Sequence, residues 1–250
     1  TADEFINSDG MIDVAAGGLA QIDSLKQGTM TSEITNAGSL TISEVQDGIL
    51  AGHLTNTGAD SALQIGSDFT LDGWIENEGT AIYENVTVEL GSLTNSGSEQ
   101  GKDLVLSDST SHTNSGLSIW NNVTVGSGAT ATNTATGENQ GYKVGSDADG
   151  ESFVIDGTFE NGTMAKLDAT EAELTTVGGV ITNAGVAGYN DMTIEAEGSS
   201  YNEGYEAGNK LTIADGGLHT NVGTSVWNEV LVQNGGTAVM GDEAKGQFYD

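Results

Sequence analysis

The chain of 250 residues contains no cysteine, no proline and no arginine. Without cysteine there is no disulfide framework, so packing of the chain itself has to supply the stability. Without arginine the chain lacks the side chain that recognises phosphate or carboxylate through two parallel hydrogen bonds. All of its basic residues are lysines, and they are dispersed along the sequence.

Positive charge is scarce: 37 acidic residues and 6 lysines give a formal net charge of −31. Nucleic acids and anionic membranes both require a basic surface, so we expect neither as a partner. No stretch approaches the roughly 18 apolar residues of a membrane span, so we expect no direct membrane insertion. The first residues, Thr-Ala-Asp-Glu, do not resemble a signal peptide. We expect residues 1–250 to form a single domain within a longer surface protein.

What the sequence does contain is a repeat, clearest in residues 112–128, HTNSGLSIWNNVTVGSG. A T-N-x-G turn is followed, nine residues after its asparagine, by an apolar-Thr-apolar triplet, and the next asparagine comes ten residues after the triplet begins. The spacing of nine recurs from Asn95 to Leu104 and from Asn202 to Leu211. Self-similarity at a period of nineteen residues predicts a solenoid.

The triplets predict the strands of this solenoid. Side chains alternate across a strand, so the first and third residues, almost all apolar, point inward and the middle threonines point outward. The same element recurs in one orientation every nineteen residues, which predicts parallel pairing between successive coils and an all-β parallel β-helix of about 12 coils. The predicted triplets begin at Val86, Leu104, Val123, Phe153, Leu174, Met192, Leu211 and Val230.

One excursion interrupts this register. Twenty residues, instead of nine, separate Asn133 from the triplet at Phe153. The extra residues fall around 137–151, GENQGYKVGSDADGE, and we interpret this segment as a candidate loop that protrudes from the solenoid.

The asparagine of each turn is the most specific feature of the repeat. Asparagine tolerates left-handed backbone angles, and its amide can bond to the coils above and below. We therefore favour a structural ladder over a binding array for this column. Its predicted members are Asn36, Asn56, Asn77, Asn95, Asn114, Asn183, Asn202 and Asn221.

A second column, three residues before the triplets, holds Tyr83, Trp120, Tyr189 and Trp227. Aromatic rings aligned along a rod can stack on sugar rings, so these four are candidate glycan-facing residues. Packing inside the coils is the alternative, because aromatic side chains mostly serve packing.

The stretch Asp147-Ala-Asp149-Gly150-Glu151 resembles part of a calcium loop, which makes Asp147, Asp149 and Glu151 candidate metal ligands. Its glycine is fourth, whereas an EF-hand loop places glycine sixth and a glutamate twelfth, so a solvated acidic loop is the alternative. Calcium is the only cofactor that the sequence suggests. The chain has no nucleophile elbow and no phosphate-binding loop, and we expect no enzyme activity.

Together these features resemble the passenger domains of bacterial autotransporters, most of all the self-associating adhesin type. The shared features are nineteen-residue coils, T-N-x-G and Gly-Gly turns, strong acidity and absence of cysteine, and residues 211–239, LTIADGGLHTNVGTSVWNEVLVQNGGTAV, show them most clearly. The resemblance covers nearly the whole chain. It implies a right-handed β-helix on the outer surface of a bacterium, acting in adhesion, aggregation or biofilm formation.

Three functions are compatible with these observations. The first is a cell-surface adhesin that binds itself, or glycans or proteins of host or bacterial surfaces, with salt or divalent cations offsetting the repulsion between acidic copies. The second is a subunit of an extracellular filament or sheath, assembled by end-to-end stacking of coils. The third is a polysaccharide-binding or polysaccharide-cleaving β-helix, because fold alone does not exclude an enzyme and paired carboxylates can hydrolyse glycosidic bonds.

Overall fold

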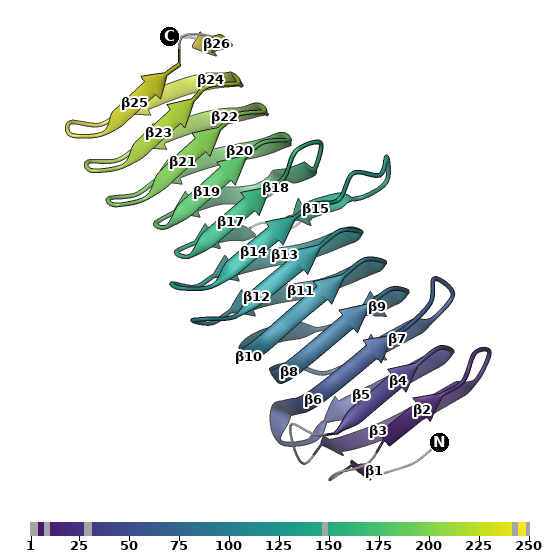
Figure 1. Cartoon of the computed structure of the whole chain (residues 1–250). Helices are drawn as coiled ribbons and strands as arrows, with labels where there is room; N and C mark the ends of the chain where they lie inside the picture. Colours follow the sequence, from purple (N-terminus) through teal and green to yellow (C-terminus); the bar gives the residue numbers. More distant parts are fainter. Residues whose placement is uncertain (1–4, 8–10, 28–31, 147–149, 242–244, 249–250) are drawn as a thin grey trace.

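The computed structural model is one continuous stack of β-coils (Figure 1) and describes residues 5–7, 11–27, 32–146, 150–241 and 245–248. Strands pair in parallel with those of the coils before and after them, and within the described ranges the first and last strands, β1, β2, β25 and β26, pair on one side only. The predicted all-β parallel solenoid, with coils of about 19 residues and about 12 coils, is confirmed.

The strands follow the repeat along the whole described chain. In chain order the elements are β1 (Phe5–Asn7), β2 (Met11–Val14), β3 (Leu19–Gln27), β4 (Glu33–Asn36), β5 (Ser39–Val45), η1 (Gln46–Gly48), β6 (Ile49–Asn56), β7 (Ala62–Ile65), β8 (Phe69–Asn77), β9 (Thr80–Ile82), β10 (Asn85–Asn95), β11 (Ser98–Leu106), β12 (Ser111–Asn114), β13 (Leu117–Val125), β14 (Thr130–Asn133), β15 (Gly141–Val144), β16 (Ser152–Ile155), β17 (Thr158–Asn161), β18 (Lys166–Val177), β19 (Val180–Asn183), β20 (Val186–Ile194), β21 (Ser199–Asn202), β22 (Tyr205–Ile213), β23 (Leu218–Asn221), β24 (Thr224–Val232), β25 (Thr237–Met240) and β26 (Lys245–Phe248).

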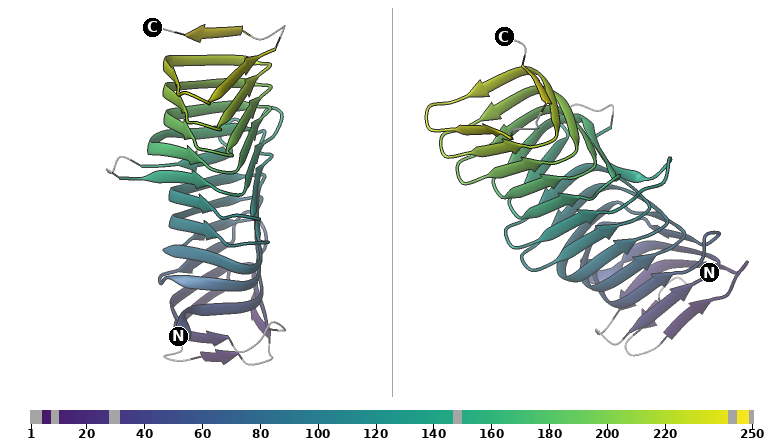
Figure 2. Two further views of the ribbon diagram at one scale, coloured as in Figure 1. Left: turned by 90° about the vertical axis from the view of Figure 1, so that its left-hand side faces the viewer. Right: turned by 45° about the horizontal axis from the view of Figure 1, so that its top comes forward.

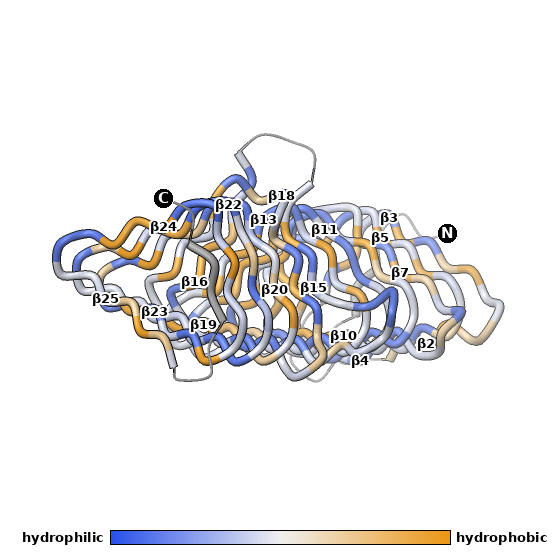
Figure 3. Tube along the Cα trace, turned by 90° about the horizontal axis from the view of Figure 1, so that it is seen from above, coloured by the Kyte–Doolittle hydropathy of each residue, from blue (hydrophilic) through white to orange (hydrophobic). Residues whose placement is uncertain are grey.

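A typical coil has three sides. In the coil of β13 and β14, the long strand β13 buries Ser118 and Trp120, then Val123 and Val125, and two consecutive outward residues separate the two pairs. The bend at these two residues divides β13 into two sides of the coil, and after a glycine-rich turn β14 forms the third. Figure 3 shows the resulting alternation of hydrophobic and hydrophilic residues around the coils.

The triplets stack in register, with one exception. Val86 lies opposite Leu104, Leu104 opposite Val123, and Val123 opposite Phe153. The prediction that the next triplet begins at Leu174 is wrong, because Phe153 lies opposite Thr175. A register shift in β18 before Leu174 moves the triplet by one residue, so Leu174 points outward, 38% exposed, while Thr175 is buried.

Part of the predicted loop at 137–151 belongs to the stack. Strand β15 lies within it and pairs with β13 on one side and β18 on the other. Residues 147–149 of the predicted loop lie outside the described residues. Figure 2 shows the stacked coils from two further directions. The excursion therefore adds a strand to the stack.

Candidate functional site

The asparagine column is a buried hydrogen-bonded ladder, as predicted. From Asn36 to Asn202, each amide Nδ2 donates to the Oδ1 of the asparagine one coil further on, at 2.7–3.0 Å, and the amide of Asn221 donates to the sulfur of Met240 at 3.7 Å. Asn133 and Asn161 belong to the ladder although the prediction omitted them, because the excursion between them stretches their spacing to 28 residues. Each such bond contributes about 0.5–1.5 kcal/mol, so this column stabilises the stack.

The aromatic column does not face a glycan, and this prediction is wrong. Tyr83, Trp120, Tyr189 and Trp227 are all at most 3% exposed, because their position in the coil points into the core. Tyr83 stacks on Trp120 with ring centroids 6.0 Å apart, and Tyr189 stacks on Trp227 at 5.8 Å. The alternative of packing inside the coils is the correct one.

Glycines make this stacking possible. The two rings of each stack come from coils that are not neighbours, and the coil between them carries Gly101 in the first stack and Gly208 in the second. A Cβ at Gly101 would overlap the ring of Trp120, and a Cβ at Gly208 would overlap the ring of Trp227. The tryptophan of the following coil thus fills the space that a side chain at the glycine would occupy.

A buried polar cluster surrounds the first stack. His112 Nε2 lies 2.6 Å from Glu99 Oε1, and Ser118 Oγ donates to the same oxygen at 2.8 Å. Trp120 Nε1 donates to Ser118 Oγ at 3.0 Å, and the Tyr142 hydroxyl lies 3.0 Å from His112 Nδ1. We call these five residues the first cluster; all are at most 1% exposed.

The same arrangement occurs again five coils later. Glu206, His219, Ser225 and Trp227 form a second cluster with the same sequence spacing, E-x12-H-x5-S-x-W. His219 Nε2 lies 3.1 Å from Glu206 Oε1, and Ser225 Oγ donates to that oxygen at 2.6 Å. Trp227 Nε1 donates to Ser225 Oγ at 2.9 Å.

Neither cluster has the geometry of a catalytic triad. In a triad the serine hydroxyl bonds to the histidine, which removes its proton. Here the Ser118 hydroxyl bonds to Glu99, and the Ser225 hydroxyl to Glu206. The clusters are also closed to solvent, so a substrate has no path to them. Their hydrogen bonds pair most of the polar groups that these side chains bury, whereas Glu99 Oε2 and His219 Nδ1 have no partner among the described residues.

Three buried tyrosines belong to the clusters or lie next to them. Burial raises the pKa of Tyr83, Tyr142 and Tyr189 well above the ordinary value of 10.0. The carboxylate of Glu99 raises the pKa of Tyr83 and Tyr142 further, and that of Glu206 does so for Tyr189. These phenols stay protonated in the folded chain.

The candidate calcium ligands can be placed only in part. Asp147 and Asp149 lie outside the described residues. Glu151 is buried and accepts hydrogen bonds from the amide and the hydroxyl of Ser146, the latter at 2.5 Å. Among the described residues no group of three or more histidine, aspartate and glutamate side chains is arranged to hold a metal ion. Calcium binding by this loop stays a prediction.

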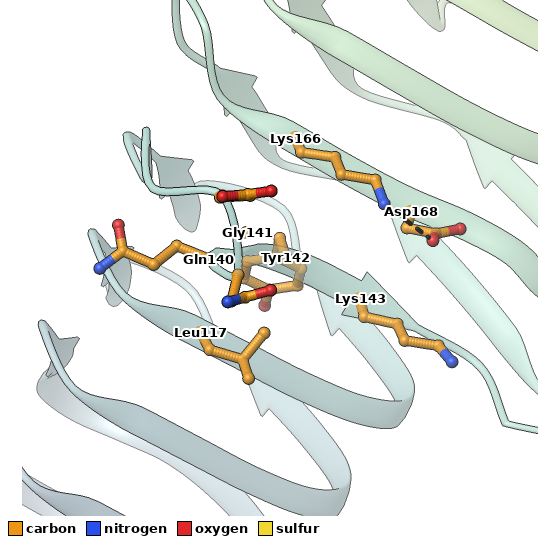
Figure 4. A pocket seen from close by; sticks show the side chains of 9 residues that line it. Leu117, Gln140, Gly141, Tyr142, Lys143, Lys166 and Asp168 are labelled. Carbon is orange, nitrogen blue, oxygen red and sulfur yellow. Dashed lines mark ion pairs between the residues drawn. The ribbon is translucent and has the colours of Figure 1, made fainter.

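The excursion also forms a pocket of about 330 Å³ on the outer side of the stack (Figure 4). Leu117 of β13, Gly141 of β15 and Lys166 of β18 occupy equivalent positions in successive coils, and Gly141 leaves the gap between the other two. Lys143 and Asp168 line the same gap, and residues 138–140 form the opposite wall. A Cβ at Gly141 would lie 2.7 Å from the carbonyl oxygen of Lys166, so glycine keeps this space open.

The outward side chains of the short strands from β10 to β25 form an almost uncharged surface, here called the short-strand face. In sequence order it consists of Ser92, Thr94, Ser111, Thr113, Thr130, Thr132, Thr158, Glu160, Val180, Thr182, Ser199, Tyr201, Leu218, Thr220, Thr237 and Val239. Glu160 is its only charged member. The part on β19, β21, β23 and β25 combines hydroxyl groups with exposed apolar side chains, among them Leu218 at 39%.

No family model matches this chain, and no curated protein or solved structure is significantly similar to it. Across the described residues, no helix has the length and apolar character needed to cross a membrane. The parallel β-solenoid is therefore supported by the structure alone.

Proposed function

We propose that this chain is a non-catalytic β-solenoid of the bacterial cell surface that associates with further copies of itself, in adhesion, aggregation or biofilm formation. The repeat resembles that of self-associating autotransporter passenger domains. The observation that carries the proposal is the short-strand face, which is nearly free of charge on a chain with a net charge of −31.

Charge decides which faces of two copies can meet. On the long-strand side, the outward threonines of the triplets are accompanied by charged side chains. Asp191 stands two residues before Thr193, and Lys210 and Glu229, which pair with each other, occupy the position of Asp191 in the next two coils. Like charges brought together there repel each other, and removing their water adds a further cost. On β19, β21, β23 and β25 the outward residues include neither a carboxylate nor a lysine.

The chemistry of the short-strand face suits a second copy of the same face. Hydroxyl groups of threonine and serine both donate and accept hydrogen bonds, so two identical rows complement each other. Val180, Tyr201 and Leu218 add exposed apolar surface that is stabilised by burial. Two identical patches meet about a twofold axis, which gives a closed dimer. Glu203 flanks the face and accepts a hydrogen bond from the Tyr201 hydroxyl at 3.1 Å.

The test is the molar mass in solution, measured by light scattering over a range of protein concentrations and salt. We expect reversible growth with concentration that becomes stronger near 0.15 M salt, where the Debye length is about 8 Å and the overall repulsion is screened. The double variant Thr182→Glu/Thr220→Glu should remain monomeric, because it places carboxylates within the contact.

The matched control is Thr193→Glu/Thr212→Glu, which adds the same charge at half-buried threonines of the triplet column. The control should associate like the unmodified chain. A chain that is monomeric under all conditions, or a control that dissociates as readily as the first variant, would contradict the proposal.

Calcium gives this test a second comparison. If copies meet through the short-strand face, calcium chloride and sodium chloride of equal ionic strength should promote association equally. Association that requires calcium and is reversed by a chelator would instead show bridging of acidic faces.

A further inference from the structure

We infer that Trp74 and its neighbours on the surface of β8 bind an amino sugar, a saccharide ring that carries an ammonium group. Figure 1 shows β8 between β6 and β10 in the N-terminal half of the stack. The inference goes beyond self-association, because Trp74 lies five coils before β19, where the uncharged part of the proposed contact begins.

Trp74 is the one tryptophan that the chain keeps at its surface. Trp120 and Trp227 are fully buried in the two clusters, whereas Trp74 is 44% exposed. It points outward at a position where the next two coils carry Ser92 and Ser111. A ligand that covers the indole removes a large apolar surface from water, which stabilises the complex.

The indole of Trp74 is supported on one side and open on the other. In the preceding coil the imidazole of His53 stands nearly perpendicular to it, with ring centroids 6.4 Å apart and an angle of 75° between the rings. In the following coil the opposite residue is Ser92, whose small side chain covers little of the indole. A ring that is already held in place loses less conformational freedom when a ligand binds.

Carboxylates stand before and after Trp74 along the same strand. Asp72 and Glu76 are two residues away in either direction, about 6.6 Å along β8, so their side chains point to the same side as the indole. Strands β6, β8 and β10 contain no lysine. Glu76 Oε2 lies 3.7 Å from His53 Nε2, longer than a hydrogen bond, and the Glu76 side chain is 56% exposed. The site therefore attracts a cation and repels an anion.

These features together match an amino sugar. The C–H face of the sugar ring packs on the indole, and an ammonium group beside it adds a cation–π attraction, which is strongest for tryptophan. Asp72 and Glu76 can accept hydrogen bonds from that ammonium group. Around them the outward hydroxyl groups of Thr55, Ser92 and Thr94 can donate to and accept from sugar hydroxyls. A neutral sugar would leave the carboxylates without a cation, and a simple ammonium ion would leave the indole uncovered.

The experiment is isothermal titration calorimetry on the monomeric chain, with tryptophan fluorescence as a second signal. The probes are glucosamine oligomers, N-acetylglucosamine oligomers of the same length, and lysine peptides of the same charge. We expect the glucosamine oligomers to bind and to change the emission of Trp74, because the other two tryptophans are buried. Trp74→Ala should abolish this binding. Asp72→Asn/Glu76→Gln should weaken it by about tenfold or more, the loss expected for a hydrogen bond to a charged group.

The matched controls remove the same kinds of side chain elsewhere. Tyr205→Ala removes an aromatic side chain that is 43% exposed on β22, and Glu195→Gln/Asp215→Asn removes two exposed carboxylates. Both controls should bind the glucosamine oligomers like the unmodified chain.

Three results would overturn the inference. The first is no binding of the glucosamine oligomers. The second is equal binding to the unmodified chain and to Trp74→Ala, or an equal loss in the controls, which would show a general attraction to the acidic surface. The third is equal binding of the acetylated oligomers or of the lysine peptides. None of these results bears on self-association, which is measured separately through molar mass.

Discussion

The chain contains the same buried cluster twice, and the two copies differ in one partner. In the first cluster His112 Nδ1 lies 3.0 Å from the Tyr142 hydroxyl, whereas in the second His219 Nδ1 has no hydrogen-bond partner among the described residues. The register explains the difference. Tyr142 lies opposite Ser118 in the following coil, and the residue at the same place opposite Ser225 is Gly246, which has no hydroxyl.

This comparison shows which coils build a cluster. Glutamate, histidine, serine and tryptophan come from two successive coils, and these four repeat together with their spacing. The tyrosine comes from a further coil and repeats independently. The excursion supplies Tyr142, so the same segment that forms the pocket also completes the first cluster. A solenoid is stabilised by contacts between neighbouring coils, and a change in one coil alters the next.

The largest expected effect comes from removing the tryptophan of each cluster. Trp120→Ala should cost about 3–5 kcal/mol, because Trp120 is fully buried and coils on both sides prevent collapse into the cavity. Trp227→Ala should cost less, because the exposed Val232 shows that the coil of Trp227 is less covered and can relax. Denaturant unfolding, supported by hydrogen exchange of the individual coils, measures both.

Trp74→Ala is the control for the tryptophan pair. Trp74 is 44% exposed on the short strand segment of β8, so its loss should cost clearly less than that of either buried tryptophan. If Trp227→Ala destabilised the chain as much as Trp120→Ala, the difference in covering between the two clusters would have no energetic consequence.

An intermediate effect is expected from Tyr142→Phe, which makes the first cluster like the second. It leaves His112 Nδ1 without a partner in the core and should cost about 1–3 kcal/mol. Tyr83→Phe is the matched control, because the Tyr83 hydroxyl is buried and has no hydrogen-bond partner in the part of the chain that the structure describes. That control should be neutral or slightly stabilising. Equal unfolding midpoints for the two variants would show that the hydroxyl of Tyr142 contributes nothing.

The raised pKa of the buried tyrosines has the smallest effect on the free energy of unfolding near neutral pH. In alkaline solution the effect becomes clear. Above the ordinary pKa of 10.0 the unfolded chain releases these protons while the folded chain retains them, so stability should fall as the pH rises beyond that value. The first cluster contains one such tyrosine, Tyr142, and adjoins a second, Tyr83. The second cluster adjoins Tyr189. Unfolding midpoints against pH should therefore fall less steeply in Tyr83→Phe. If the unfolding midpoint of this variant fell as steeply with pH as that of the unmodified chain, the raised pKa of Tyr83 would be contradicted.

Much of the fold could be predicted from the sequence because the repeat is strict. The spacing between asparagines and triplets predicted the coil and the ladder. The prediction failed at Asn133 and Asn161, where an insertion changes the spacing, and at Leu174, where a register shift moves the triplet. The inward direction of the aromatic column was one of two alternatives that the sequence left open, and the glycines of that column, which leave space for a neighbouring ring, favour it.

The candidate sites were harder to predict than the fold. The identical spacing of residues 99–120 and 206–227 is visible in the sequence, and aligning these segments would have revealed both clusters. The pocket could not be predicted, because it depends on how β15 inserts between β13 and β18. The short-strand face required the structure as well. Threonine precedes most ladder asparagines in the sequence, but only the structure shows that these threonines lie on one surface.

The most direct test of self-association through the short-strand face uses the absence of native cysteine. Thr220 on this face and Thr212 in the triplet column belong to successive strands and are both half-buried. Under mild oxidation Thr220→Cys should form disulfide-linked dimers, and Thr212→Cys should remain monomeric. Equal cross-linking of the two variants, or cross-linking of Thr212→Cys alone, would contradict the account.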